Sequence, residues 1–317
     1  PADTAFMDKL TALCKRRGFI YQSSEIYGGI GGFWDYGPLG VELKRNIKDL
    51  WWHDMVTNPP IGPDGHEVEM VGVDCSIIMN PKVWEASGHA TGFADPMVDC
   101  KSCKARFRLD KVFHVVVSRA AGATELAHFS VEADSAAGAR DAAQTQAKKL
   151  AKKHGGGEVV VEAIPFKDVI DAQLATLKCP ACDAQGSLTE PRAFNLMFET
   201  FVGAVQDASA KAFLRPETAQ GIFANFKNVL DTTRVKVPFG IAQVGKSFRN
   251  EINPRNYTFR SREFEQMEIE FFCHAADSMQ WYEFWRNVRY NWYVNLGLKS
   301  EKLRLRDQGP EELAHYS

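Results

Sequence analysis

The chain has 317 residues, of which 45% are hydrophobic, and its formal net charge is −2 at pH 7. This length and composition allow a sizeable core, and we expect two structural units. The chain has no run of about eighteen apolar residues, and residues 1–10 lack the apolar core of a signal peptide. We therefore expect a cytoplasmic protein without a membrane span. The near-neutral charge leaves a nucleic-acid partner open, because a neutral protein can carry a local basic patch.

The N-terminal part predicts two helices separated by a glycine-rich loop. Apolar residues recur at helical spacing over residues 6–18, and Gly18 ends that segment. Residues 28–40 contain neither a P-loop nor a Rossmann pattern, and they fit a flexible connection as well as a substrate-approach loop. Residues 39–56 predict an amphipathic helix, and 67–79 predict a strand. Core packing would explain the stripe of the second helix fully; it consists of Leu43, Ile47, Leu50, Trp51 and Met55.

Two Cys-x-x-Cys knuckles in the middle of the chain predict a metal site. They are Cys100 with Cys103 and Cys179 with Cys182. Two such knuckles suit tetrahedral Zn²⁺, and four thiolates close the coordination sphere, which indicates a structural ion. The alternative is disulfides or free thiols, and a cytosolic context disfavours disulfides. Between the knuckles, strands at 112–118, 126–131 and 158–164 and a helix at 136–153 predict a small inserted α/β module.

After residue 190 the sequence predicts a helix, a hairpin and a second helix. Pro216 stands where a helix would start, with Glu217 in its first turn and Phe223 and Phe226 in the core. Strands at 241–251 and 260–272 flank the turn 253–256. An aromatic helix at 279–296 is expected to pack in the core.

The hairpin carries a mixture of residues that suits a nucleotide. Strand alternation places Arg249 and Glu251 on one face of the first strand. It also gives one face of the second strand the set Arg260, Arg262, Phe264 and Glu268. Arginine binds phosphate, an aromatic ring stacks on a base, and carboxylates accept from amino groups. A surface hairpin with cross-strand ion pairs is the alternative.

The same residues resemble a known pattern. Phe248-Arg249-Asn250-Glu251, a loop, and then Arg260, Phe264 and Glu268 are similar to motif 2 of class II aminoacyl-tRNA synthetases. Further blocks resemble glycyl-tRNA synthetases, and the resemblance covers about residues 10–110 and 190 onward. These blocks are Tyr21–Gly29, Asp35–Gly40, Ser87–His89, Phe93–Pro96 and Leu214–Phe223.

The resemblance implies an α+β class II catalytic domain, an antiparallel sheet flanked by helices, with an inserted zinc-ribbon and α/β module. Residues 1–97 would hold motif 1, 98–190 the insertion and 191–317 motif 2, with the chain ending before motif 3 and the anticodon-binding domain. The helix of motif 1 implies a homodimer. The missing initiator Met and the abrupt end suggest a processed or truncated chain, and we expect these 317 residues alone to be inactive.

The implied activity is that of a glycine–tRNA ligase, which joins glycine to ATP and passes it to tRNA(Gly). Arg249 is implied as the catalytic residue that bridges the α-phosphate and the glycine carboxylate, and Mg²⁺ would assist. Residues 252–258 would meet the tRNA acceptor end, and the basic helix at 136–153 would either follow the acceptor stem or be a solvated face. The implied ATP-binding residues are Arg249, Asn250, Glu251, Phe259, Arg260, Ser261, Arg262, Glu263 and Phe264.

Glycine offers only its ammonium and carboxylate, so its site needs carboxylates near the ammonium and little space beyond. Each of the Glu side chains and Arg108 could instead be an ordinary ion-pair partner. A catalytically inactive relative that binds nucleic acid or a partner enzyme, and a class II synthetase for another amino acid, remain alternative functions. The implied glycine-binding residues are Arg108, Glu217, Phe264, Glu265, Gln266, Met267 and Glu268.

Overall fold

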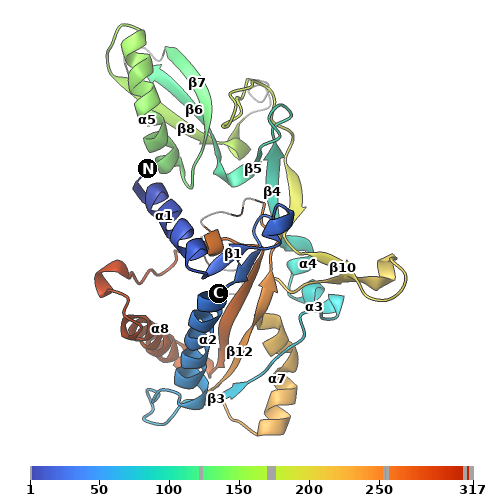
Figure 1. Cartoon of the computed structure of the whole chain (residues 1–317). Coiled ribbons are helices and arrows are strands. Elements are labelled where there is room, and N and C mark those ends of the chain that lie inside the picture. Colours follow the sequence, from blue (N-terminus) through green and yellow to red (C-terminus); the bar gives the residue numbers. More distant parts are fainter. Residues whose placement is uncertain are drawn as a thin grey trace. The chain divides into compact units, whose positions relative to one another are not determined.

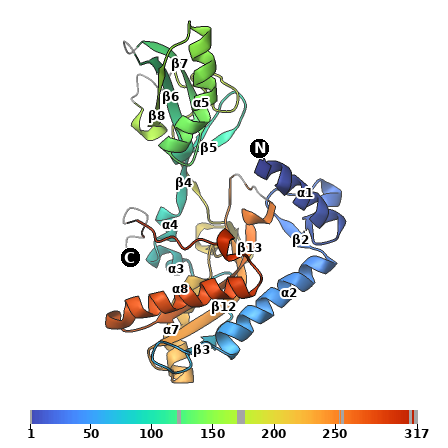
Figure 2. The same cartoon turned by 90° about the vertical axis from the view of Figure 1, so that its left-hand side faces the viewer.

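The computed structural model describes residues 2–120, 124–169, 176–252, 254, 257–309 and 313. It divides into two compact units, whose elements are labelled in Figures 1 and 2. Unit 1 comprises Pro1–Val83, Glu199–Arg249 and Pro254–Ser317, and unit 2 comprises Trp84–Phe198 and Asn250–Asn253. The limits expected for the insertion, 98–190, stay a prediction. Among the helices that the structure describes, none has the length and apolar character to cross a membrane.

The sheet of unit 1 is built on the predicted hairpin. It has the order β13–β12–β3, with β3 at Glu69–Gly72, β12 at Phe239–Phe248 and β13 at Glu263–Phe272. The pair β12–β13 is antiparallel from Phe239↔Phe272 to Phe248↔Glu263, and β3 runs parallel to β12. The hairpin is confirmed, but its strands are shorter than predicted. Arg249, Glu251, Arg260 and Arg262 therefore lie beyond the strands, and β3 fills only part of 67–79.

Helices cover the two faces of this sheet. Helix α2 (Pro38–Trp52), continued by a π-helical turn at His53–Thr57, packs with α8 (Ser278–Asn295) on one face. Helix α7 (Ala219–Thr233) packs on the other face against Phe239, Ile241 and Phe272. Figure 2 shows α2 and α8 on the same side of β12. Side chains of β13 therefore alternate between the α7 face and the α2/α8 face.

Two of the predicted helical faces differ from expectation. Trp51 and Met55 are buried, but Leu43 is 51% and Leu50 is 42% exposed, so core packing does not explain the whole stripe of α2. Phe226 of α7 packs against the core, whereas Phe223 of the same helix is 52% exposed. Helix α7 also begins three residues later than predicted, because Thr218 is its N-cap and Pro216 and Glu217 precede it.

The remaining elements of unit 1 are the N-terminal helix and several short strands and helices. Helix α1 (Ala2–Arg16) confirms the predicted N-terminal helix, and Gly18 follows it with a φ of 74°. The glycine-rich segment contains a short strand, β2 (Trp34–Tyr36), paired with β1 (Ile20–Gln22). Strands β10 (Glu199–Phe201) and β11 (Lys211–Phe213) form a separate hairpin before α7. Helix α3 (Pro81–Ala86) spans the unit boundary.

Unit 2 contains two three-stranded antiparallel sheets and the small helix α4 (His89–Gly92). One sheet has the order β5–β4–β9, with β4 at Ala94–Asp99, β5 at Arg106–Arg108 and β9 at Arg192–Asn195. The other has the order β7–β6–β8, with β6 at Val112–Arg119, β7 at Glu125–Glu132 and β8 at Val159–Pro165. Helix α5 (Ala136–Lys153) packs on the second sheet, which confirms the predicted elements of the α/β module.

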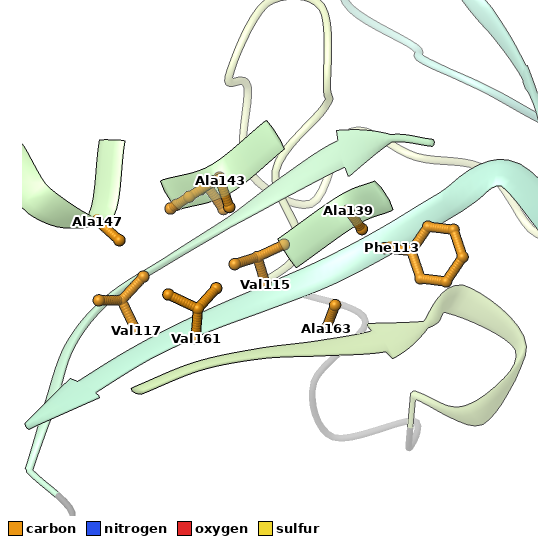
Figure 3. Packing of buried hydrophobic residues seen from close by; sticks show 9 residues of the cluster. Phe113, Val115, Val117, Ala139, Ala143, Ala147, Val161 and Ala163 are labelled. Atoms are coloured by element: carbon orange, nitrogen blue, oxygen red, sulfur yellow. The ribbon is translucent and has the colours of Figure 1, made fainter. Parts of the chain in front are cut away.

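Alanines set the distance between α5 and its sheet. Ala139, Ala143 and Ala147 recur every four residues and are buried against the valines of β6 and β8 (Figure 3). Residues four apart share one face of a helix, and the small side chains let the helix backbone approach the strands closely.

A larger side chain at this contact should destabilise the module. We expect Ala143→Leu to lower the free energy of unfolding by about 1–3 kcal/mol, because the extra volume forces α5 away from the sheet. Urea unfolding measures the effect. Ala142→Leu on the exposed face of the same helix is the matched control, with an expected change within about 0.5 kcal/mol. Equal effects of the two substitutions would contradict the packing described here.

Candidate active site

The α7 face of the hairpin changes from apolar to polar along β12 and β13. Next to the core formed with α7, the strands bring Gln243 opposite Glu268 and Ser247 opposite Phe264. Gln243 and Ser247 are fully buried, and the Ser247 hydroxyl donates to Gln266 Oε1 at 2.8 Å. This part of the sheet is the floor of the candidate site.

Arg215 fixes the segment that leads into α7. The side chain is only 2% exposed, and it donates from Nε to Lys246 O and from Nη1 to Cys75 O, both at 2.7 Å. The guanidinium lies across Gly245, where a Cβ would overlap Nη2. Phe248 N–H also donates to Arg215 O at 2.9 Å. These bonds tie Glu217 and Thr218 to the end of β12.

Arg249 lies at the centre of the candidate site. Its Nε donates to Pro216 O at 3.1 Å, and its Nη2 lies 3.8 Å from Glu217 Oε2. The guanidinium also stands 5.4 Å from the centroid of the Phe264 ring. The structure therefore brings together three of the predicted residues, from the end of β12, from β13 and from the segment before α7.

Two carboxylates, Glu217 and Glu268, lie beside Arg249, and Glu270 lies near both of them. Glu268 accepts a hydrogen bond from the Thr218 hydroxyl, and Gln220 Nε2 donates to Glu217 Oε1 at 2.7 Å. Burial raises the pKa of Glu268, and the charge of Glu217 raises it further against the opposing bond from Thr218. Burial and the charges of Glu268 and Glu217 raise the pKa of Glu270 to about 7.

Glu270 is absent from the sequence-based set. The sequence could have indicated Glu270, because it stands two residues after Glu268 in a strand. Strand alternation places both side chains on one face.

The same alternation places the side chains of three predicted site residues on the opposite face of the sheet. The side chains of Glu263, Glu265 and Met267 lie on the α2/α8 face, away from Phe264 and Glu268. Glu263 pairs with Lys246 at 2.5 Å, and Glu265 pairs with Lys44 and with Lys48. Met267 packs with the α2/α8 core. The ATP-binding role of Glu263 and the glycine-binding roles of Glu265 and Met267 stay predictions.

The segment before β13 contacts the glycine-rich loop. Arg262 donates from Nη1 to Gly31 O at 2.6 Å, and its N–H donates to Gly32 O at 2.7 Å. Ser261 is buried and bonds to Glu263 O, Arg260 is half-buried, and Phe259 is 86% exposed. Within the predicted tRNA-facing loop, Asn253, Arg255 and Asn256 lie outside the described residues, so the predicted turn is not assessed.

Three predicted residues lie in unit 2. Asn250 N–H donates to Leu196 O at 2.7 Å. Arg108 forms two 3.0 Å bonds with Asp110 and a 3.0 Å ion pair with Asp95. The bond with Asp110 is the main cause that raises the pKa of Arg108, and Glu251 adds to it. These pairs agree with the ion-pair alternative for Arg108, and its glycine-binding role stays a prediction.

Two buried amide atoms at the candidate site have no hydrogen-bond partner among the described residues. They are Gln220 Oε1, which can only accept, and Gln243 Nε2, which can only donate. An unpaired buried polar atom is costly, so such atoms favour a polar ligand. An α-amino acid offers an ammonium donor and a carboxylate acceptor, one for each kind of atom.

The four cysteines of the knuckles meet in unit 2. Their Sγ atoms all lie within 4.8 Å of one another. The closest pairs join the two knuckles, with Cys100 Sγ and Cys182 Sγ 3.7 Å apart and Cys103 Sγ and Cys179 Sγ also 3.7 Å apart. Sulfur atoms in a disulfide lie only about 2.05 Å apart, so the structure holds four thiols. Their spacing fits four thiolates around one Zn²⁺ ion with Zn–S distances of about 2.3 Å.

The chemistry of Cys100 also suits a metal ligand. Burial opposes ionisation of its thiol, but hydrogen bonds with Ser187 and from the Cys103 backbone N–H outweigh it and lower the pKa to about 6. The pKa of Cys179 is raised, mainly by burial, and the pKa of Cys182 is also raised, so of these three thiols only Cys100 is shifted toward the thiolate. A thiolate is the form that binds zinc.

The chain is similar to known aminoacyl-tRNA synthetases. Residues 199–315 match the family model of the tRNA synthetase class II core domain (G, H, P, S and T). The chain is 54% identical to glycine–tRNA ligase of Rhodopirellula baltica, over 98% of this chain and 58% of that protein. It is 47% identical to the glycine–tRNA ligases of Alkaliphilus oremlandii and Acetivibrio thermocellus, with the same coverage. The chain thus spans about 58% of the length of the curated relatives it matches.

Among solved structures, the chain superimposes on threonyl-tRNA synthetase from Cryptosporidium parvum Iowa II, titled as its RNA binding domain, with a TM-score of 0.42 and 12% identity. That match covers 89% of this chain and 41% of the other. The family assignment rests instead on the core-domain match and on the high identity along the sequence. Residues 199–315 therefore hold a class II tRNA synthetase core domain, and the chain is similar over nearly its whole length to the glycine–tRNA ligases.

Proposed function

We propose that the protein is a glycine–tRNA ligase, which activates glycine with ATP and transfers it to tRNA(Gly) in the cytoplasm. The observation that carries this proposal is the assembly of Arg249, Glu217 and Phe264 on one face of the hairpin. The relatedness to glycine–tRNA ligases supports the same amino acid.

In the first step, a glycine carboxylate oxygen attacks the α-phosphorus of ATP. A P–O bond forms to the carboxylate, the bond to the β-phosphate oxygen breaks, and pyrophosphate leaves. Arg249 would contact both the α-phosphate and the carboxylate, which aligns them and stabilises the negative charge that develops. Its present contacts, Pro216 O and Glu217, hold the guanidinium over the floor of the site.

The nucleotide would be held by the residues around the hairpin. Phe264 would stack on adenine, and Glu251 would accept from the adenine amino group. Arg260 and Arg262 would bind the distal phosphates, where Mg²⁺ would supply further positive charge. Asn250, Ser261 and Phe259 would complete this set at positions that follow from the family pattern.

Glycine would bind through its two charged groups. Glu217 and Glu268 would accept from the ammonium, and Gln220 Oε1 is a further acceptor beside Glu217. Gln243 Nε2 and Arg249 would donate to the carboxylate. Gln266 would orient Ser247 beside the site, and Arg108 would contact glycine as the family pattern implies.

Unit 2 would act as the insertion of this synthetase, with a structural Zn²⁺ held by Cys100, Cys103, Cys179 and Cys182. Helix α5 carries four exposed lysines near its C-terminal end, Lys148, Lys149, Lys152 and Lys153, which would contact acceptor-stem phosphates. The exposed leucines of α2, Leu43 and Leu50, would be covered by a second copy in a homodimer.

Glycine-dependent exchange of labelled pyrophosphate into ATP tests the proposed function. We expect the full-length protein to catalyse exchange with glycine and not with alanine or serine, and then to charge tRNA(Gly). Exchange with a different amino acid would replace glycine as the substrate. Binding of tRNA without any exchange would favour the inactive-relative alternative.

A further inference from the structure

Glu270 occupies the boundary between the hydrophobic core and the candidate glycine site. Along the α7 face of β13, Phe272 packs in the core formed with α7, Glu270 follows, and Glu268 reaches the site. The partner of Glu270 across the ladder is Ile241, which is fully buried. A carboxyl group in this place is partly removed from water and stands beside two other carboxylates.

The charged surroundings of Glu270 are mostly acidic. Glu268 on β13 and Glu217 before α7 both act on its carboxyl group. The positive charge of Arg249, at the end of β12, interacts with Glu268. The charge of the buried Arg215 also interacts with Glu268. Gln220 and Phe223 near the start of α7 carry no charge, and neither does Val71 of β3, which packs on the same face.

Three acidic groups in one place cannot all stay ionised at low cost. Like charges in a partly buried cluster favour retention of a proton, and the arrival of a cation favours its loss. A glycine ammonium would bring that cation, because Glu217 and Glu268 are its proposed acceptors.

We propose that Glu270 is the proton-exchanging member of a three-carboxylate site, so that binding of the glycine ammonium expels one proton from the cluster of Glu217, Glu268 and Glu270. The inference rests on the proposed function and adds a residue and a proton linkage to it. Glu270 acts through Glu268 and is a positioning residue.

The direction of the pH dependence follows from the pKa of Glu270, about 7 in the ligand-free protein. Bound ammonium stabilises the ionised carboxylate and lowers this pKa, so the proton is released near and below pH 7. Glycine affinity therefore rises as the pH increases. For one proton with a pKa of about 7, the apparent dissociation constant of glycine should fall about tenfold between pH 6 and pH 8.

Isothermal titration of glycine into the full-length protein, in two buffers of different ionisation enthalpy, counts the protons released. At pH 6.5 we expect about 0.8 proton per glycine in the wild type and close to none in Glu270→Gln, whose glycine affinity should lose its pH dependence. Glu199→Gln, which removes an exposed carboxylate paired with Lys211, is the matched control and should behave as wild type.

The outcomes separate the two proposals. Glycine binding without proton release in the wild type overturns the linkage and leaves the proposed function intact. If Glu270→Gln and the wild type release the same number of protons per glycine, the role of Glu270 is overturned. Absence of glycine binding at every pH, in protein that still binds ATP, overturns the proposed function and the linkage with it. If Glu270→Gln does not fold, the wild-type proton count decides on the linkage. The same titration with Glu270→Asp then decides on the role of Glu270.

Discussion

Arg249→Ala should abolish glycine-dependent pyrophosphate exchange, with a loss of about a thousandfold or more. In the proposed reaction, this guanidinium faces both the attacking carboxylate and the α-phosphate, so its removal leaves the developing charge without its main partner. Loss of one donor preorganised for a transition state costs about 3–4 kcal/mol, and loss of a full charge should cost at least as much. The contacts with Glu217 and Phe264 would also be lost, which would free both side chains.

Two further variants sharpen this experiment. Arg249→Lys keeps the positive charge but not the planar pair of donors, so most of the activity should still be lost. Arg16→Ala at the exposed end of α1 is the control and should leave exchange unchanged. Near-normal exchange by Arg249→Ala, in a protein whose melting temperature matches that of the wild type, would remove Arg249 from the catalytic site.

Loss of the zinc site should have the second large effect, on the stability of unit 2. Cys100 and Cys179 are buried in a core cluster with Val98, Phe107 and Leu177, so two of the four thiolates also join the packing of this unit. Structural zinc contributes roughly 10–16 kcal/mol of apparent binding free energy in small zinc domains at neutral pH. We expect Cys103→Ser with Cys182→Ser to lose zinc and to make residues 94–112 and 176–195 exchange amide hydrogens rapidly.

Metal analysis and hydrogen exchange test this expectation together. The wild type should contain about one zinc ion per chain, and a strong chelator should reproduce the exchange pattern of the double variant. Cys273→Ser, which changes a free cysteine outside the cluster, should keep both zinc and protection. Zinc below about a tenth of an equivalent in freshly purified wild type, with unit 2 still protected, would rule out a structural ion.

The elements with strong local patterns were predictable from sequence alone. The limits of α5 agree with the predicted 136–153, because alanines at every fourth position, a serine N-cap and a following glycine run all define the same helix. The hairpin and the four-cysteine cluster were also predictable, since each depends on residue types at fixed spacing. The alternation of β12 and β13 indicates which side chains share a face, whereas the register comes from the structure.

Side-chain contacts were not predictable where they depend on distant segments. Glu265 and Met267 entered the predicted site as part of a continuous block, although a strand shows only every second side chain to one face. Glu265 instead meets Lys44 and Lys48 of α2, a helix about two hundred residues earlier, and no local pattern reveals that pair. Glu270 was missed for the complementary reason, since its importance comes from burial beside Glu217 and Glu268.

The cross-knuckle pairing of the cysteines has a consequence for chain entropy. Cys100 lies beside Cys182 and Cys103 beside Cys179. The metal site would therefore cross-link the two ends of the long inserted segment that contains β6, β7, α5 and β8. The entropy cost of closing a loop grows only with the logarithm of its length, by about 0.6 kcal/mol for each doubling. Once its ends are cross-linked, residues can be added to or removed from such a segment with little change in the stability of the chain on either side.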